Sequence, residues 1–152
     1  DWSSDVCSSD LGEGGIRLKI ALVEDNELHR SQISREIKDY FSELNEVCEL
    51  HTFENGSDLL DHYASVGGYD LLLLDIQLPG IDGMSVAKQI RLTDEKVLII
   101  FITSMIAYAV QGYSVHALDY ILKPINRISF RSTLDHARKL FRQRFALCTS
   151  GR

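Results

Sequence analysis

The sequence contains few cysteines, and their arrangement suggests neither a disulfide framework nor a metal site. The three cysteines are Cys7, Cys48 and Cys148. They are odd in number, lie far apart and form no C-x-x-C pair, which suits a reducing compartment better than a disulfide-stapled secreted domain. Cys48 has two interpretations, a redox sensor or a small apolar residue in a strand, and the second is much the commoner.

The sequence also lacks long apolar runs and an excess of positive charge. No run approaches the ~20 residues that a membrane-spanning helix needs, and no basic segment followed by an apolar one marks a secretory signal. We therefore expect a cytoplasmic protein with no membrane partner. The formal net charge of −6 at pH 7 argues against electrostatic binding of nucleic acid by this segment. The five histidines are scattered, and we expect each to be solvated or packed.

Residues 1–11 show no hydrophobic periodicity and are rich in Ser and Asp. Composition predicts a disordered lead-in, and the string DWSSDVCSSDL also resembles the translation of a sequencing-library adapter. Excluding residues 1–15 as such an artefact or lead-in removes four acidic residues and changes the net charge from −6 to −2. We predict a domain over 16–145, with 146–152 as the start of a linker or a truncated end.

From residue 17 onward, short apolar runs alternate with stretches of helical periodicity. Ile33, Ile37 and Tyr40 show the helical spacing, with Asn26 as a plausible N-cap. A further short helix is expected near 106–112 and a last one through 130–145. Strand-length apolar runs occupy 18–23, 48–53, 71–74, 97–102 and 118–122. Five successive strand–helix units predict an α/β fold, in which a parallel sheet carries helices on both faces.

Polar and charged residues follow the ends of these predicted strands. Glu24 and Asp25 follow the first strand, and Asp75 follows the third. Thr103 and Lys123 follow the fourth and fifth. Ligands of open parallel sheets bind outside the carboxyl ends of the strands. Three carboxylates gathered at one edge raise one another's pKa or require a cation.

This set of side chains suits phosphoryl transfer. Mg²⁺ favours a couple of carboxylates together with phosphate oxygens. A carboxylate nucleophile beside it, with Lys123 and Thr103 to orient the transferred group, is a site for aspartyl-phosphate formation. Each residue alone has an ordinary interpretation, such as a solvated turn for Glu24 and Asp25 or a helix cap for Thr103. Their placement at one edge favours the joint interpretation.

Four segments together resemble the receiver domains of two-component response regulators. They are VEDN (23–26), LLLLDIQLPGIDGM (71–84), FITS (101–104) and LDYILKP (118–124). The resemblance covers roughly 17–145. It implies a CheY-like, flavodoxin-like fold, with a doubly wound, five-stranded parallel sheet in the strand order 2-1-3-4-5. It also implies no enzyme activity beyond the domain's own phosphotransfer and autodephosphorylation.

The resemblance assigns the nucleophile and the metal ligands position by position. Asp75 matches the phosphorylated aspartate, and Mg²⁺ is the implied cofactor. Asp25 matches the principal metal ligand, with Glu24 as its acidic neighbour, often acting through water. Gln77 would offer its backbone carbonyl to the metal.

The resemblance also assigns a phosphate contact and a switch. Lys123 matches the phosphate-binding lysine, and its bond to Pro124 is expected to be cis. Thr103 matches the switch hydroxyl, and Tyr120 matches the aromatic that swings inward when Thr103 is drawn to the phosphate. Phosphorylation then shifts the population of an output surface.

The stretch YAVQGYSVHALDYILKP (108–124) resembles receivers that precede a LytTR-type DNA-binding domain. The implied partners are a sensor histidine kinase, a second copy on phosphorylation, and DNA only through an output domain missing from this segment. A dimer surface and core packing remain equal interpretations for the residues expected on the output face, which are Tyr108, Gln111, Tyr113, His116, Arg127 and Arg131.

Three alternatives compete with a transcription-controlling receiver. A flavodoxin-like module for a small ligand needs a Gly/Ser/Thr-rich loop after the first strand, where the acidic Glu24-Asp25-Asn26 stands. A haloacid-type phosphatase needs a second Asp two residues after the first, where Gln77 stands. A stand-alone receiver that acts by protein contact stays open.

Overall fold

The structure of the protein, a computed structural model, describes residues 3–6, 17–104 and 115–150, and the side chains within 17–104 and 115–143. The helix predicted near 106–112 lies outside the described residues, as do Tyr108, Gln111 and Tyr113. Within the described residues, no helix combines the length and the apolar character needed to cross a membrane.

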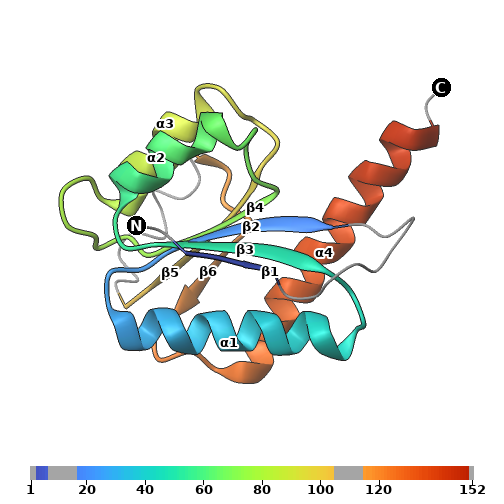
Figure 1. The fold of residues 1–152 in the computed structure, drawn as a ribbon, viewed down its shortest axis with the longest axis horizontal. Coiled ribbons are helices and arrows are strands. Elements are labelled where there is room, and N and C mark those ends of the chain that lie inside the picture. Colours follow the sequence, from blue (N-terminus) through green and yellow to red (C-terminus); the bar gives the residue numbers. More distant parts are fainter. Residues whose placement is uncertain (1–2, 7–16, 105–114, 151–152) are drawn as a thin grey trace.

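A six-stranded sheet forms the centre of the fold, in the order β1-β3-β2-β4-β5-β6 (Figure 1). Five strands are parallel, and their order confirms the predicted 2-1-3-4-5 topology. These strands are β2 (Leu18–Val23), β3 (Cys48–Phe53), β4 (Leu71–Leu74), β5 (Leu98–Thr103) and β6 (Asp119–Leu122).

The sixth strand, β1 (Ser3–Val6), is an addition that composition did not predict. It pairs antiparallel with β3 at the edge of the sheet, with Ser3 opposite Thr52 and Val6 opposite Glu49. An edge strand presents unpaired backbone N–H and C=O groups, and a short segment can satisfy them without any hydrophobic pattern. The expectation of disorder is therefore wrong for residues 3–6. That residues 1–15 are foreign to the domain stays a prediction.

In the part of the chain that the structure describes, four helices cover the two faces of the sheet (Figure 1). On one face lie α2 (Gly56–Ser65) and α3 (Gly83–Arg91), and on the other lie α1 (Glu27–Glu43) and α4 (Arg127–Ser150). Asn26 caps α1 as predicted, because its side chain accepts a hydrogen bond from the N–H of His29. Helix α4 continues to Ser150, past the predicted domain end at 145.

The central strands are apolar on both sides because helices cover both faces. In β4, Leu71 and Leu73 pack in the cluster under α1 and α4, whereas Leu72 and Leu74 pack in the cluster under α2 and α3. All four are fully buried, and burying each side chain contributes roughly 1.5–3 kcal/mol. This double burial holds the carboxyl end of β4 rigidly in the middle of the sheet.

Ion pairs tie α4 to α1 and to the residues that follow α1. Arg131 donates to Glu43 at 2.7 Å, and Arg138 and Arg142 donate to Glu46 at 3.0 and 2.7 Å. Arg127 lies 3.3 Å from Glu36 in the same row. That Arg127 and Arg131 belong to an output face stays a prediction, and their described partners lie on α1.

Candidate functional site

The candidate residues lie at or just after the carboxyl ends of four parallel strands, β2, β4, β5 and β6, and so share one edge of the sheet. Val23 pairs in register with Leu74, and Leu74 pairs with Phe101. Backbone hydrogen bonds then extend past the strand ends. Asp75 N donates to Val23 O at 3.1 Å, and Lys123 N donates to Thr103 O at 3.0 Å. The predicted meeting of these residues at one edge is thus confirmed for their backbones.

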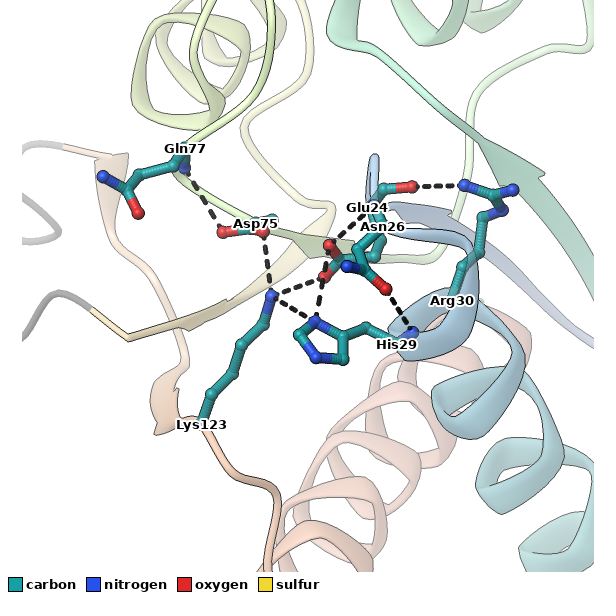
Figure 2. Close-up of polar contacts among 7 residues, drawn as sticks. All are labelled: Glu24, Asn26, His29, Arg30, Asp75, Gln77 and Lys123. Atoms are coloured by element: carbon teal, nitrogen blue, oxygen red, sulfur yellow. Dashed lines mark hydrogen bonds and ion pairs between the residues drawn. The ribbon is translucent and has the colours of Figure 1, made fainter.

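The ammonium group of Lys123 lies at the centre of the site (Figure 2). Its Nζ donates to Glu24 Oε1 at 2.8 Å and to Asp75 Oδ2 at 3.0 Å. It also lies 3.3 Å from His29 Nδ1. The peptide bond from Lys123 to Pro124 is cis, as expected. Lys123 therefore acts as the internal counter-charge for two carboxylates.

Glu24 is an acid held almost entirely away from solvent, with 1% of its surface exposed. Its Oε1 accepts from Lys123 and its Oε2 accepts from Asn26 N at 3.1 Å. Burial raises the pKa of Glu24, and the charge of Asp75 raises it further, against the hydrogen bonds from Lys123 and Asn26. The ionised acid is thus costly at this position, and these hydrogen bonds offset part of the cost.

Lys123 remains an ammonium ion in this environment. Burial alone lowers the pKa of Lys123, but the hydrogen bonds and charges of Glu24 and Asp75 together exceed that effect and raise it. A permanently positive group within hydrogen-bond distance of Asp75 is suited to pair with negative phosphoryl oxygens.

Three carboxylates provide a possible metal site. Oxygens of Glu24, Asp25 and Asp75 lie within 4.8 Å of one another, with Asp25 exposed and the other two buried. Carboxylate oxygens are the ligands that hard divalent ions prefer, so the donor set fits Mg²⁺. Both oxygens of Glu24 already accept hydrogen bonds. Both oxygens of Asp75 accept hydrogen bonds as well, so hydrogen bonding does not rank these two acids, and the direct role of Asp25 and the water-mediated role of Glu24 stay predictions.

Gln77 contributes its backbone to the site. Its N–H donates to Asp75 Oδ1 at 3.2 Å, and its side chain extends away from Asp75 (Figure 2). The carboxylate of Asp75 is thereby oriented from both sides, by Gln77 N at Oδ1 and by Lys123 at Oδ2. That the carbonyl of Gln77 binds the metal stays a prediction.

The two predicted switch residues lie at the same end of the sheet. Thr103 is the last residue of β5 and is fully buried. Tyr120 on β6 is half-buried, and its ring packs 5.3 Å from that of Phe101. Their roles in a switch stay predictions.

Sequence reasoning missed three contributors to the site. His29 was expected to be solvated or packed, but it contacts Lys123. Arg30 donates to the carbonyl of Glu24 at 2.8 Å. Gly83, just after the Asp82 cap of α3, lies against the backbone of Asp75, with no room for a Cβ. A glycine inside the start of a helix is unfavourable by propensity, which is the one signal that could have drawn attention to it.

A cavity of about 410 Å³ opens beside the site. Its lining includes Lys123 and His29, together with Ile33 of α1 and the segment Pro124–Ile125 after β6. The cavity therefore borders Lys123 from the side of α1, and its lining does not include Asp75.

Comparison with known proteins gives a consistent family. Residues 20–135 match the family described as the response regulator receiver domain. The sensory transduction protein LytT of Oceanobacillus iheyensis is 33% identical over 126 residues, which are 82% of this chain and 49% of that protein. The transcriptional regulatory protein YpdB of Escherichia coli K12 is 34% identical over 107 residues, 70% of this chain and 42% of that protein. The chain thus spans about half the length, or less, of these relatives.

Solved structures show the same fold. The response regulatory domain of protein mrkE from Klebsiella pneumoniae superposes with a TM-score of 0.74 at 29% identity, covering 83% of this chain and 99% of that one. The BeF3-activated DrrB receiver domain, at 22% identity and a TM-score of 0.65, supports the fold alone. The predicted resemblance, including the kinship with LytT-type regulators, is confirmed.

Proposed function

Because the chain belongs to the response regulator receiver domain family, we propose that Asp75 accepts a phosphoryl group from the phosphohistidine of a sensor kinase. The observation that carries this proposal is the position of Lys123 Nζ, which bridges Asp75 at 3.0 Å and the buried Glu24 at 2.8 Å beside the exposed Asp25. Packing does not require this group of charges, whereas phosphoryl transfer to a carboxylate does.

The transfer follows from the contacts of Asp75. A carboxylate oxygen of Asp75 attacks phosphorus, the bond from phosphorus to the donor nitrogen breaks, and the donor imidazole keeps that electron pair and takes up a proton. Gln77 N–H and Lys123 orient the carboxylate. Lys123 then pairs with an oxygen of the phosphoryl group. Asp25 and Asp75 would hold Mg²⁺, which would supply positive charge to neutralise the remaining phosphoryl charge.

Phosphorylation is proposed to act as a switch rather than to complete a catalytic cycle. Thr103 is the last residue of β5, the strand beside β4, which supports a role for its hydroxyl at this edge of the sheet. Movement of Thr103 toward that group would let Tyr120 change its packing on Phe101, which favours one arrangement of the β6 edge. The outcome is a surface that differs between the two states.

The proposed output is control of transcription in the cytoplasm, through a LytTR-type DNA-binding domain in a longer protein and with a homodimer formed on phosphorylation. The relatives named as transcriptional and sensory transduction regulators support this proposal. The alternative is a receiver that acts alone by protein contact. Sequencing the uninterrupted reading frame on both sides separates the two, because the first requires a DNA-binding domain downstream.

The test is labelling by a small-molecule phosphodonor, followed by intact mass spectrometry with and without Mg²⁺. The parent should gain one phosphoryl group only with Mg²⁺, whereas Asp75→Asn should gain none and Asp25→Ala should lose the Mg²⁺-dependent reaction. Asp61→Asn is the matched control, because this exposed acid lies on α2. Labelling of Asp75→Asn at the parent rate would remove Asp75 as the acceptor.

A further inference from the structure

The ammonium group of Lys123 has three protons, and three acceptors surround it. Two are the carboxylates of Glu24 and Asp75, and the third is the ring nitrogen Nδ1 of His29 at 3.3 Å. An ammonium ion can only donate. As a hydrogen bond, this contact therefore requires Nδ1 of His29 to accept, which places the proton of the neutral ring on Nε2. The same Nδ1 lies 4.0 Å from Glu24 Oε2.

We propose that His29 is a positioning residue for Lys123, and through it for phosphoryl transfer to Asp75. This inference rests on the proposed function of Asp75. Nothing in the resemblance to receiver domains assigned a role to this position, and the contact is visible in Figure 2.

His29 matters because Lys123 exchanges one of its hydrogen bonds during phosphoryl transfer. When a phosphoryl group reaches Asp75, the bond from Lys123 to Asp75 Oδ2 is the one exchanged for a bond to a phosphoryl oxygen. Glu24 and His29 are then the two acceptors that keep the ammonium group in place. A lysine stem has four rotatable bonds, so holding it at two points reduces the freedom that must be lost at transfer.

His29 is itself fixed relative to Glu24 by the cap of α1. The side chain of Asn26 accepts from His29 N at 3.0 Å, while the N–H of Asn26 donates to Glu24 Oε2 at 3.1 Å. Arg30, the next residue, donates to the carbonyl of Glu24. The first turn of α1 and the end of β2 thus form one hydrogen-bonded unit. The imidazole of His29 extends from this unit to Lys123.

The competing interpretation is a surface histidine whose approach to Lys123 has no consequence. The side chain of His29 is 43% exposed, and it lines the cavity beside the site. If that interpretation holds, the third ammonium proton is satisfied equally well by water, and replacing the ring changes nothing in the reaction.

Two substitutions separate these interpretations in the full chain. His29→Asn keeps an acceptor near the position of Nδ1, whereas His29→Leu keeps similar bulk and removes the acceptor. We expect the rate of labelling by a small phosphodonor at saturating Mg²⁺ to fall about three- to tenfold in His29→Leu, the effect of one hydrogen bond. His29→Asn should recover to within about twofold of the parent. The Mg²⁺ concentration for half-maximal rate should stay unchanged, because Asp25 and Asp75 are intact.

The nitrogen resonances of His29 provide a readout that is independent of phosphorylation. In ¹⁵N spectra of neutral His29, Nδ1 should appear unprotonated, and Lys123→Met should shift its resonance by removing the donor. The proposal is overturned if His29→Leu labels at the parent rate, if His29→Asn is as slow as His29→Leu, or if Lys123→Met leaves the Nδ1 resonance in place. Labelling that no longer depends on Asp75 would instead refute the proposed function, so the two failures are distinguishable.

Discussion

Replacing Gly83 by alanine should damage the site through the backbone of Asp75. A Cβ at Gly83 would overlap the carbonyl oxygen of Asp75, and it would lie 2.9 Å from the carbonyl carbon of Asp75 and 3.0 Å from Cα of Ile76. All three atoms belong to the backbone, so no side chain can rotate away. The N–H of Gly83 also donates to Ile76 O at 2.9 Å, which holds the two segments together.

The size of the effect follows from that overlap. The two segments must separate by roughly 1 Å to reach ordinary van der Waals distance, and overpacking of this kind costs about 1–3 kcal/mol. At about 2–4 °C per kcal/mol for a chain of this size, the melting temperature should fall by about 2–12 °C. A shift of roughly 1 Å in a reacting group can reduce a rate about 100-fold, so labelling of Asp75 should slow by at least about tenfold.

Gly80→Ala is the matched control for Gly83→Ala. Gly80 has a φ of 78°, and a Cβ there meets no atom within 4 Å. The left-handed backbone costs alanine about 1–2 kcal/mol, which is a comparable loss of stability without pressure on Asp75. Thermal melting and phosphodonor labelling of both variants decide the matter. Parent-like labelling of Gly83→Ala, or an equal loss of labelling in Gly80→Ala, would refute the reasoning.

Three further predictions concern metal, alkali and acid. Mg²⁺ at ten times its Kd should stabilise the parent by about 1.4 kcal/mol and raise its melting temperature, and Asp25→Ala should lose this shift; an equal shift in both would contradict the metal site. Burial, together with Asp135, raises the pKa of Tyr40 from 10.0 to about 12. The stabilisation from the protonated hydroxyl of Tyr40 is therefore complete below pH 10 and is lost as pH rises toward 12. In urea unfolding measured against pH, the free energy of unfolding of Tyr40→Phe should fall less at alkaline pH than that of the parent. The hydrogen bond from Arg138 lowers the pKa of Glu46 from 4.5, so the stabilisation from ionised Glu46 is present above pH 4.5 and is lost as pH falls through the folded pKa. Glu46→Gln should lower the free energy of unfolding by about 1 kcal/mol at pH 7, and that free energy should then fall less in acid than it does in the parent. An unchanged fall in acid would contradict a stabilising pair between Glu46 and Arg138.

The strands and the residues at their ends could be predicted because a local pattern determines them. A run such as Leu71–Leu74 is apolar on both sides only where both faces are covered, and parallel connections bring the strand ends to one edge. The edge position of Asp75 and Lys123 follows from topology alone, and the structure brings their side chains to 3.0 Å.

The contacts that depend on packing between distant segments could not be predicted. The approach of Gly83 to Asp75 depends on how α3 leaves its loop, and the row of arginines on α4 meets acids in and after α1 only because both helices cover one face. The pairing of Ser3–Val6 with β3 uses backbone groups, which leave no trace in the side-chain pattern. His29 carried no signal beyond its place in the first turn after two acids.

Glu24 gives the sharpest test of whether the site needs a carboxylate or only a polar side chain. Both of its oxygens accept from donors, Lys123 Nζ and Asn26 N, so a glutamine can satisfy only one of them and must turn its NH₂ toward the other. The substitution also removes a buried negative charge, which is unfavourable because burial and the charge of Asp75 raise the pKa of Glu24. A donor facing a donor, with a charge-assisted bond lost, costs about 1–3 kcal/mol, and we expect this cost to exceed the gain from removing that charge. Glu24→Gln should therefore melt below the parent, while Glu95→Gln, at an exposed acid, should melt with it. A Glu24→Gln variant more stable than the parent would mean that charge repulsion, and not the holding of Lys123, dominates the energetics of the site.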